Sequence, residues 1–478
     1  MKNSAIKLIL FCILIYLLYN YAVLPYTWDS SAIIEPLVLA LFAFVIYFLR
    51  DERQVGLKGQ AMTLSLPFLL GFIPTCMLLY ILYSFDITTD LAQGYSLDYS
   101  VVTHSAYLST IGFVSYLLGN VTCTTPYRIR KEKKEIRCNT VLPQRIAIVL
   151  FLIFFIFMDK RYFLGGYHEL SNTKGALSPI AVQAQVFLKY LIAASIITTS
   201  WNIYNSPERK DLTIKKYFLK FSFSFRWMVI IYTILVIMSG DRDPLLTTLF
   251  LTAFSYILVK GIKIGTAKVA VLIILAAGLF WFLGYFRNTD FSSGLSSRLS
   301  YTFEKMSTSE LGIWDIFDEY TRIIRTQHTL ISYANQGHFL PIHGIVYPIL
   351  GLIPGLGFLY TTILGIDQID IVSSHIAKSA MDADHGMGTT CIADLYIIWG
   401  VTSVVIFMFL FGYITKKIER SVYQENISFF LWCAYLALLT EMVYVCRSNV
   451  FGCFRVMMYI FIIVYLCNSV GGVKHNRV

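Results

Sequence analysis

The stretch Arg287-Asn288-Thr289-Asp290 begins a long interval that has no obvious membrane span at either end. The interval closes with Asp382-Ala383-Asp384-His385-Gly386-Met387-Gly388-Thr389-Thr390. The rest of the chain consists of hydrophobic runs joined by short loops. We therefore expect the runs to form a scaffold, and this interval to cap a site at the outer surface of a membrane. It also holds most of the polar candidates: Arg298, Arg322, Arg325, His328, His338, His343, Asp367, Asp370 and His375.

The composition is that of a membrane protein. Apolar residues make up 56% of the chain and charged residues only 14%, which is typical of a polytopic membrane protein and far from a soluble domain. The net charge is +10, but the Lys and Arg residues gather in alternate loops, as the positive-inside rule describes. The charge therefore indicates orientation and contact with anionic membrane lipid. It argues against nucleic acid as a partner.

The hydrophobic runs predict an all-α fold with about twelve transmembrane helices. A span needs about 20 apolar residues, and only helices or closed barrels satisfy the backbone in lipid. The basic loops then fall on the same side as both termini, which we expect to be cytoplasmic. No cleavage site follows the first run, so we expect it to remain as an anchor. The predicted spans are 6–24, 32–49, 61–84, 100–120, 146–163, 181–200, 226–239, 245–260, 269–286, 390–414, 428–446 and 453–470.

This topology divides the chain into three parts. Residues 1–286 hold the first nine spans, 287–389 form one long extracytoplasmic segment, and 390–478 hold the last three spans and a short cytoplasmic tail. Within the outer segment, apolar residues at helical spacing predict an amphipathic helix over 308–336. Residues 344–365 are apolar but broken by Pro and Gly. They predict a re-entrant or interfacial helix pair, where a lipid-linked substrate would lie.

Arginines on the predicted outer side are candidate phosphate ligands. Arg242 lies in a tight turn between two spans, Arg287 ends a span, and Arg447 begins a short outer turn. Outer loops normally avoid Arg, and a guanidinium binds phosphate in a bidentate fork. We therefore expect these residues to hold a diphosphate and to stabilise it as a leaving group without a metal. The alternatives are local pairing of Arg242 with Asp, and snorkelling of the others to lipid headgroups.

Gly386 and Gly388 precede the tenth predicted span and resemble a phosphate cradle at a helix start, where free N–H groups favour anions. A flexible hinge explains the same glycines equally well. The spacing is not that of a nucleotide-binding loop. Asp394, one turn into the span, is an acid near lipid depth and is therefore either functional or paired with an arginine.

Candidate acid–base groups lie in the outer segment. We single out His338 and His385, because imidazole titrates near neutral pH, and Asp384 as the carboxylate alternative. Asp382-x-Asp384 has the form of a divalent-metal motif, but such matches are frequent by chance. No Cys/His cluster has metal-ligand spacing. We therefore expect neither a metal nor a cofactor.

Taken together, these features resemble the bacterial O-antigen polymerases (Wzy-type polysaccharide polymerases). The resemblance lies in the many spans, the long outer loop late in the chain, Gly240-Asp241-Arg242, the Gly-rich entry Gly386–Tyr396 and the later Arg447-Ser448. It covers chiefly 236–460. Family members often carry Glu before Leu-Tyr, where this chain has Asp394. A GT-C-like architecture is compatible with this resemblance.

The resemblance implies an enzyme that joins undecaprenyl-diphosphate-linked oligosaccharide repeat units into an O-antigen or capsule. The reaction would take place at the outer face of the bacterial cytoplasmic (inner) membrane. Arg242 and Arg447 would hold the diphosphate, Arg287 would assist, and a His or Asp of the outer loop would be the base. A chain-length regulator protein is a further partner that this function implies.

Three other membrane functions compete with this interpretation. A structural or sensory membrane protein would leave the outer arginines replaceable without loss of function. An O-antigen ligase would share the fold and the arginines and differ mainly in its acceptor. A lipid-linked-oligosaccharide flippase needs charged residues in the middle of its spans. Here Lys189 and Glu441 are among the few such residues. We rank the polymerase first, the ligase second and the flippase third.

Overall fold

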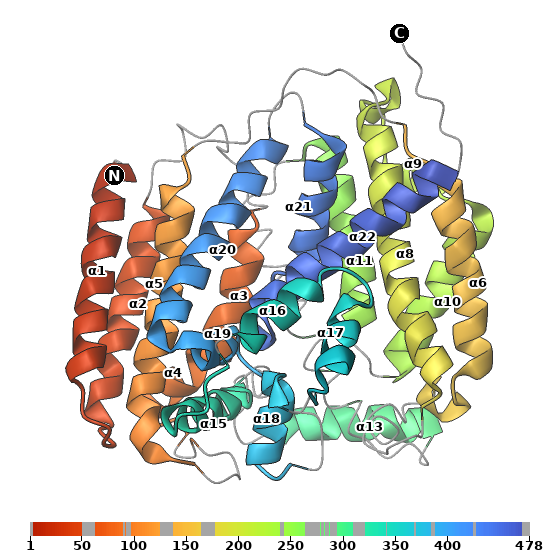
Figure 1. Ribbon diagram of the computed structural model, residues 1–478. Coiled ribbons are helices and arrows are strands. Elements are labelled where there is room, and N and C mark those ends of the chain that lie inside the picture. The colour runs from red at the N-terminus through yellow and green to blue at the C-terminus, as the bar shows by residue number, and fades with distance from the viewer. Residues whose placement is uncertain are drawn as a thin grey trace. The chain divides into compact units, whose positions relative to one another are not determined.

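A computed structural model describes most of the chain, and all of its described secondary structure is helical (Figure 1). No strand occurs among these residues. The described residues are 3–49, 63–88, 91, 97–124, 137–163, 177–239, 243–262, 278, 282, 286, 294–308, 321–340, 342–367, 370–383, 388–423 and 427–470.

Helices occupy all of the predicted spans except 269–286, which lies almost entirely outside the described residues. They begin and end within a few residues of the hydrophobic runs, because the backbone of an apolar segment is satisfied only by its own helix. The helices are α1 (Asn3–Val23), α2 (Ile34–Phe48), α3 (Ser65–Cys76), α4 (Leu78–Ser84), α5 (Val102–Thr122), α6 (Val141–Phe157), α8 (Pro179–Tyr204), α10 (Phe223–Ser239), α11 (Asp243–Lys260), α19 (Cys391–Trp399), α20 (Val401–Val422), α21 (Phe429–Glu441) and α22 (Val450–Val470).

Six of the described helices are long and apolar enough to cross a membrane: α1, α2 with its preceding turn, α5, α8, α20 and α22. The pair α3 and α4 makes a seventh if it is one span, bent by 50°. Four apolar helices are shorter: α6, α10, α11 from Thr247 and α21. The chain is therefore a polytopic helical protein, while the number of twelve spans and their orientation stay predictions.

The tenth predicted span is wrong as one continuous helix, because the chain breaks between α19 and α20 at Gly400. This residue has φ 65° and ψ −145°, a conformation that side-chain-bearing residues rarely adopt. The Ser403 side chain closes the break, since its hydroxyl lies 2.5 Å from the Leu395 carbonyl and accepts the Trp399 N–H at 3.2 Å. As a result, α19 is a separate short helix outside the candidate spans.

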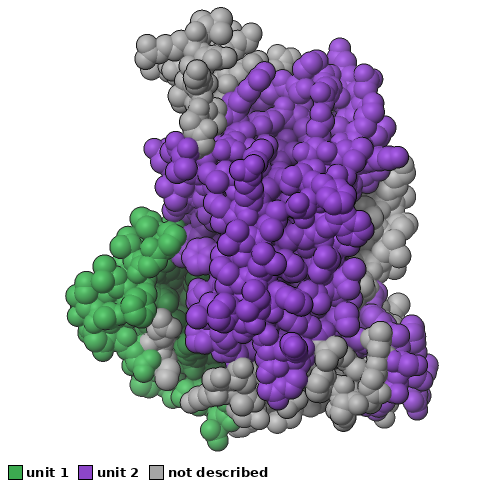
Figure 2. All heavy atoms as spheres, turned by 90° about the vertical axis from the view of Figure 1, so that its right-hand side faces the viewer, with its two compact units in different colours: residues 1–128, 317–425, 441–455 green, residues 129–316, 426–440, 456–478 purple. Residues whose placement is uncertain are grey.

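The chain divides into two compact units that interleave along the sequence (Figure 2). Unit 1 contains residues 1–128, 317–425 and 441–455, and unit 2 contains 129–316, 426–440 and 456–478. The two units are defined by contacts between residues, whereas the three predicted parts of the chain are defined by membrane topology. The two divisions therefore describe different properties of the chain.

In unit 1, α5 is the central helix, and α1, α2 and α20 pack around it. The α5–α20 crossing is close because glycines lie on both helices. A Cβ at Gly119 would lie 2.0 Å from the Phe409 carbonyl oxygen, and one at Gly412 would lie 2.1 Å from the Tyr116 carbonyl oxygen. Small residues of this kind let two membrane helices approach and pack without a hydrophobic driving force.

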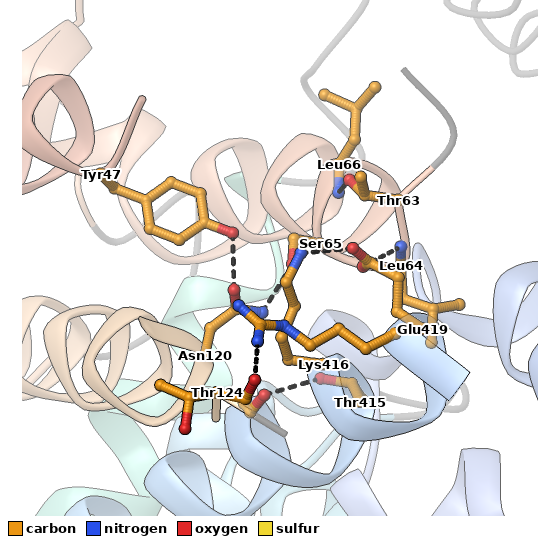
Figure 3. Close-up of polar contacts among 12 residues, drawn as sticks. Tyr47, Thr63, Leu64, Ser65, Leu66, Asn120, Thr124, Thr415, Lys416 and Glu419 are labelled. Carbon is orange, nitrogen blue, oxygen red and sulfur yellow. Dashed lines mark hydrogen bonds and ion pairs between the residues drawn. The ribbon is translucent and has the colours of Figure 1, made fainter. Parts of the chain in front are cut away.

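A buried polar cluster, which we call the Glu419 cluster, joins one end of α2, α3, α5 and α20 (Figure 3). Lys416 and Glu419 form an ion pair with side chains only 3% and 0% exposed, and the Leu64 N–H donates to the second Glu419 oxygen at 3.0 Å. Asn120 accepts from the Tyr47 hydroxyl at 2.8 Å and donates to Ser65 Oγ at 2.8 Å. These hydrogen bonds and the ion pair hold the four helix ends together. They lie at the end of unit 1 opposite to α15, which is described below.

Unit 2 is built on α6 and α8, against which α10 and α11 pack. Individual hydrogen bonds connect elements of unit 2. Ser222 N–H donates to Gln144 Oε1 at 2.9 Å, and the Trp432 indole N–H of α21 donates to Ser200 Oγ of α8 at 3.0 Å. The short α9 (Ile214–Leu219) contacts α11 through Tyr217 and Ser255, whose hydroxyls lie 2.7 Å apart.

The described helices of the predicted outer segment (287–389) are α13 (Gly294–Ser307), α15 (Ile324–Asn335), α16 (His343–Leu350), α17 (Leu356–Leu364) and α18 (Ser373–Ala380). Of the helix predicted over 308–336, α15 covers 324–335 and residues 322–323 form a turn, while 309–320 lie outside the described residues. The broken apolar stretch 344–365 forms the pair α16–α17, and Gly355 between them has φ 84°. Large apolar side chains of this pair are exposed, including Phe358 (69%) and Ile363 (71%).

Candidate functional site

Helix α19 lies beside α15, and the two run in the same direction. The Thr390 hydroxyl before α19 lies 2.5 Å from Gln327 Oε1 near the start of α15. At the other end, the Tyr396 hydroxyl donates to Asn335 Oδ1 at 2.8 Å. Just beyond α15, Leu340 N–H donates to the Ile397 carbonyl at 2.8 Å. Residues 327–340 are thus held along the length of α19, and Figure 1 shows α15 below α19.

Two predicted phosphate-binding elements meet at the start of α19. A Cβ added to Gly388 would lie 3.7 Å from the Arg447 carbonyl oxygen and 3.5 Å from the Ile323 side chain. Gly388 is exposed and Arg447 is half-buried. Arg447 ends the short 3₁₀ turn η9 (Val445–Arg447), which packs on α19. Residues 59 positions apart in the sequence therefore form one local structure.

The beginning of α19 has the geometry of a helix N-terminus. Thr390 is in an extended conformation, and its hydroxyl accepts the Ala393 N–H at 3.1 Å, as a standard N-cap does. The first N–H groups of a helix and its dipole favour negative charge. This end of α19 therefore suits an anionic group such as a phosphate, and the backbone of Arg447 lies beside it.

Asp394 is a buried acid one turn into α19, only 5% exposed. Desolvation by burial raises the pKa of its carboxyl to about 7, although hydrogen bonds from the Ser373 and Thr389 hydroxyls oppose the rise. The Ser373 hydroxyl of α18 donates directly to Asp394 Oδ1. A carboxyl with a pKa near neutrality can accept or release a proton at the working pH.

Next to this site, a network of buried hydrogen bonds connects α15 with α4 and α5. The Gln327 amide donates to Ser105 Oγ at 2.8 Å and to Ser109 Oγ at 2.9 Å, both on α5. The Tyr80 hydroxyl lies 2.8 Å from Nε2 of His328, which is 1% exposed. Burial lowers the pKa of His328 to about 3. The imidazole is therefore neutral at physiological pH, and its place in the network is structural.

The structure places three of the predicted site residues and does not bring all three together. Gly388 and Arg447 are adjacent, as described. His338 is exposed and stacks on Tyr333, with ring centroids 4.6 Å apart. It lies near the C-terminal end of α19, at the far end from Gly388. The other predicted residues, Arg242, Arg287, Asp384, His385 and Gly386, lie outside the described residues.

Sequence reasoning gave too little weight to two residues of this site. Arg322 is exposed and precedes Ile323, which contacts the position of Gly388. Gln327 is 0% exposed and joins Thr390 to α5. Arg322 could have been identified as a candidate from the sequence, because it is an Arg on the predicted outer side. Gln327 carried none, because a polar amide in an amphipathic stretch looks like a surface residue.

Comparison with known proteins connects nearly the whole chain to a family. The family model described as O-antigen polysaccharide polymerase Wzy matches residues 2–469. No curated protein and no solved structure matches the chain.

Proposed function

Because the chain belongs to the O-antigen polysaccharide polymerase Wzy family, we propose that it joins undecaprenyl-diphosphate-linked oligosaccharide repeat units into a surface polysaccharide. The reaction takes place at the outer face of the bacterial cytoplasmic membrane. The enzyme is a membrane glycosyltransferase whose donor carries a polyprenyl diphosphate. A chain-length regulator protein is a proposed partner.

The observation that carries this proposal is the meeting of Gly388 and Arg447 at the N-terminus of α19. The positive end of the helix dipole favours a diphosphate. The backbone of Arg447 lies at this helix end, and we propose that its guanidinium binds the diphosphate there. Arg322, which is exposed and whose neighbour Ile323 lies close to the same glycine, is a second arginine near this helix end. Arg242, Arg287 and Gly386, which lie outside the described residues, stay proposed diphosphate ligands from the sequence. Positive charge at this site stabilises the diphosphate as it leaves, with no metal required.

The helix pair α16–α17 provides a surface for the polyprenyl tail. Its exposed apolar side chains, including Ile349, Ile353, Phe358 and Ile363, suit a position in the membrane interface. An acyl or prenyl chain loses contact with water when it packs on such a surface. We therefore assign the tail to this pair.

The chemistry is an attack by an acceptor hydroxyl on the anomeric carbon of the donor sugar. A new C–O bond forms, the bond from the anomeric carbon to the diphosphate oxygen breaks, and the hydroxyl proton passes to a base. His338, Asp384 and His385 are proposed bases from the sequence. Asp394 is the candidate that the geometry adds, since its pKa is about 7 and Thr389 beside it borders the phosphate end of α19.

The test is a gel ladder of surface polysaccharide from a strain lacking this chain, complemented with wild type, Arg447→Ala or the matched control Arg455→Ala. Arg455 is exposed and lies eight residues further along. We expect Arg447→Ala to leave single repeat units attached to the lipid core, and Arg455→Ala to restore the ladder.

Two results would contradict the proposal. If the strain lacking the chain attaches no unit at all, a ligase or a flippase explains the protein better. If Arg447→Ala makes a normal ladder, Arg447 does not hold the diphosphate.

A further inference from the structure

Four neutral polar side chains meet at the C-terminal end of α19, and we call them the tyrosine cluster: Tyr21, Tyr26, Tyr396 and Asn335. The Tyr21 hydroxyl donates to the Tyr396 hydroxyl at 3.1 Å, which in turn donates to Asn335 Oδ1 at 2.8 Å. The Tyr26 hydroxyl lies close enough to those of Tyr21 and Tyr396 to influence them electrostatically. Among the described residues, no Asp, Glu, Lys or Arg hydrogen-bonds to these four side chains.

The tyrosine cluster is open to solvent on one side. Tyr26 is 52% exposed and Asn335 is exposed, whereas Tyr396 is buried. Phe339, which is 39% exposed, packs its ring on Tyr396 with centroids 6.3 Å apart. The site therefore combines a buried polar floor with exposed rings.

The exposed Tyr26 ring has a fixed orientation. It stacks on His104 with ring centroids 3.8 Å apart and an interplanar angle of 3°, while Tyr21 meets the same imidazole edge-on at 5.2 Å. His104 is itself only 1% exposed. An exposed ring that is held in this way presents a preorganised surface to a ligand.

We infer that the tyrosine cluster binds sugar residues of the lipid-linked substrate. A pyranose has hydroxyl groups that both donate and accept hydrogen bonds, and a face of C–H groups that packs on aromatic rings. Phenol and amide groups match the hydroxyl groups, and the exposed rings match the C–H face. Interfacial tyrosines that only anchor a helix to lipid have no need for hydroxyl groups converging on an exposed amide.

This inference rests on the proposed function and extends it. Thr390 and Tyr396 are six positions apart, which corresponds to about 9 Å along a helix. The N-terminal end of α19 has the positive end of the helix dipole, with the backbone of Arg447 beside it, while the C-terminal end carries neutral groups. The two ends therefore suit the two chemically different parts of one substrate, the diphosphate and the saccharide.

The test uses the full-length protein in lipid nanodiscs and the host's own repeat-unit oligosaccharide, freed from its polyprenyl diphosphate by mild acid. Binding is measured by calorimetric titration. We expect Tyr26→Ala and Asn335→Ala to weaken binding by about ten-fold. The matched controls Tyr19→Ala and Gln336→Ala, which replace exposed neighbours, should bind as the wild type does.

Arg447→Ala separates this inference from the proposed function. It should weaken binding of the intact lipid-linked unit but leave binding of the freed oligosaccharide unchanged, because the freed sugar has no diphosphate. The inference is overturned if the wild type does not bind the freed oligosaccharide, or if the cluster variants bind it as tightly as the controls do. The proposed function fails by a different result, a ladder that persists in the strain lacking the chain.

Discussion

At the scale of single residues, Asp394 is the group whose ionisation we expect to govern the reaction. Below its pKa of about 7 the carboxyl already holds a proton and cannot accept one from the acceptor hydroxyl. Polymerisation by the purified protein should therefore fall as the pH drops through about 7. Asp394→Asn should abolish it at every pH, as measured by initial rates on lipid-linked repeat units.

Ser373 offers a sharper version of this prediction. Its hydrogen bond favours the ionised carboxylate and lowers the Asp394 pKa, so Ser373→Ala should raise that pKa. The midpoint of the pH–rate profile should move to higher pH. Ser379→Ala, at an exposed position on the same helix, is the control and should leave the midpoint in place. A profile that does not move in Ser373→Ala would remove Asp394 from the role of base.

The same pKa also affects stability. Because the folded protein raises the Asp394 pKa above its ordinary value, the folded state binds this proton more tightly than the unfolded state does. The wild type should therefore lose stability as the pH rises from about 4 towards 7. Asp394→Asn has no charge to bury and should lose less over this range. Thermal unfolding of both proteins across the range measures the difference.

Part of the site could be predicted residue by residue. Gly388, Arg447 and Asp394 stood out because glycine or charge is unusual beside an apolar run, and a physical reason attaches to each. That His338 lies at the other end of α19 could not be predicted, because it depends on the direction in which α15 packs. The burial of Gln327 depends on the same packing.

At the scale of helices, the α5–α20 crossing should be the most sensitive contact in unit 1. Gly119→Ala and Gly412→Ala each place a Cβ within about 2 Å of a backbone oxygen on the other helix, so the helices must separate. We expect each change to lower the free energy of unfolding by about 1–3 kcal/mol and to lower the unfolding temperature in detergent. Gly452→Ala, where the added Cβ would meet only Ser448 Oγ at 3.8 Å, should have little effect.

The Glu419 cluster makes a second prediction at this scale. Lys416→Met leaves a buried carboxylate without its cation and should cost about 3–5 kcal/mol. Lys416→Met combined with Glu419→Gln removes both charges and keeps an acceptor for the Leu64 N–H, so it should recover most of that loss. The same thermal assay distinguishes the outcomes. A double variant less stable than the single one would show that the charges themselves stabilise the fold.

Helix positions were the most predictable feature of the chain, because hydrophobic length alone indicates a span. The breaks were not predictable from hydropathy. The bend between α3 and α4 and the end of α19 at Gly400 lie inside continuous apolar runs. In both cases, local backbone geometry and packing decide where one helix ends.

At the scale of the whole molecule, orientation is the open prediction. We expect the α15 end of unit 1 to face outwards and the Glu419 cluster to face the cytoplasm. In intact cells, a membrane-impermeant thiol reagent should label Gln336→Cys, whereas Lys417→Cys should react only after the cells are permeabilised. Both variants require a background in which Cys12, the exposed native cysteine of the described residues, is replaced. Labelling of both in intact cells would contradict the predicted topology.

The shortness of α19 has a consequence for the product. If the substrate lies along α19 as proposed, with the diphosphate at one end and sugar at the other, this helix contacts only the few sugars nearest the lipid anchor. A short chain and a long chain of repeat units then present the same surface to the enzyme. Contact at α19 would then not depend on the number of repeat units already joined. We therefore expect the characteristic length of the finished polysaccharide to be set by competition between polymerisation and release, or by another protein.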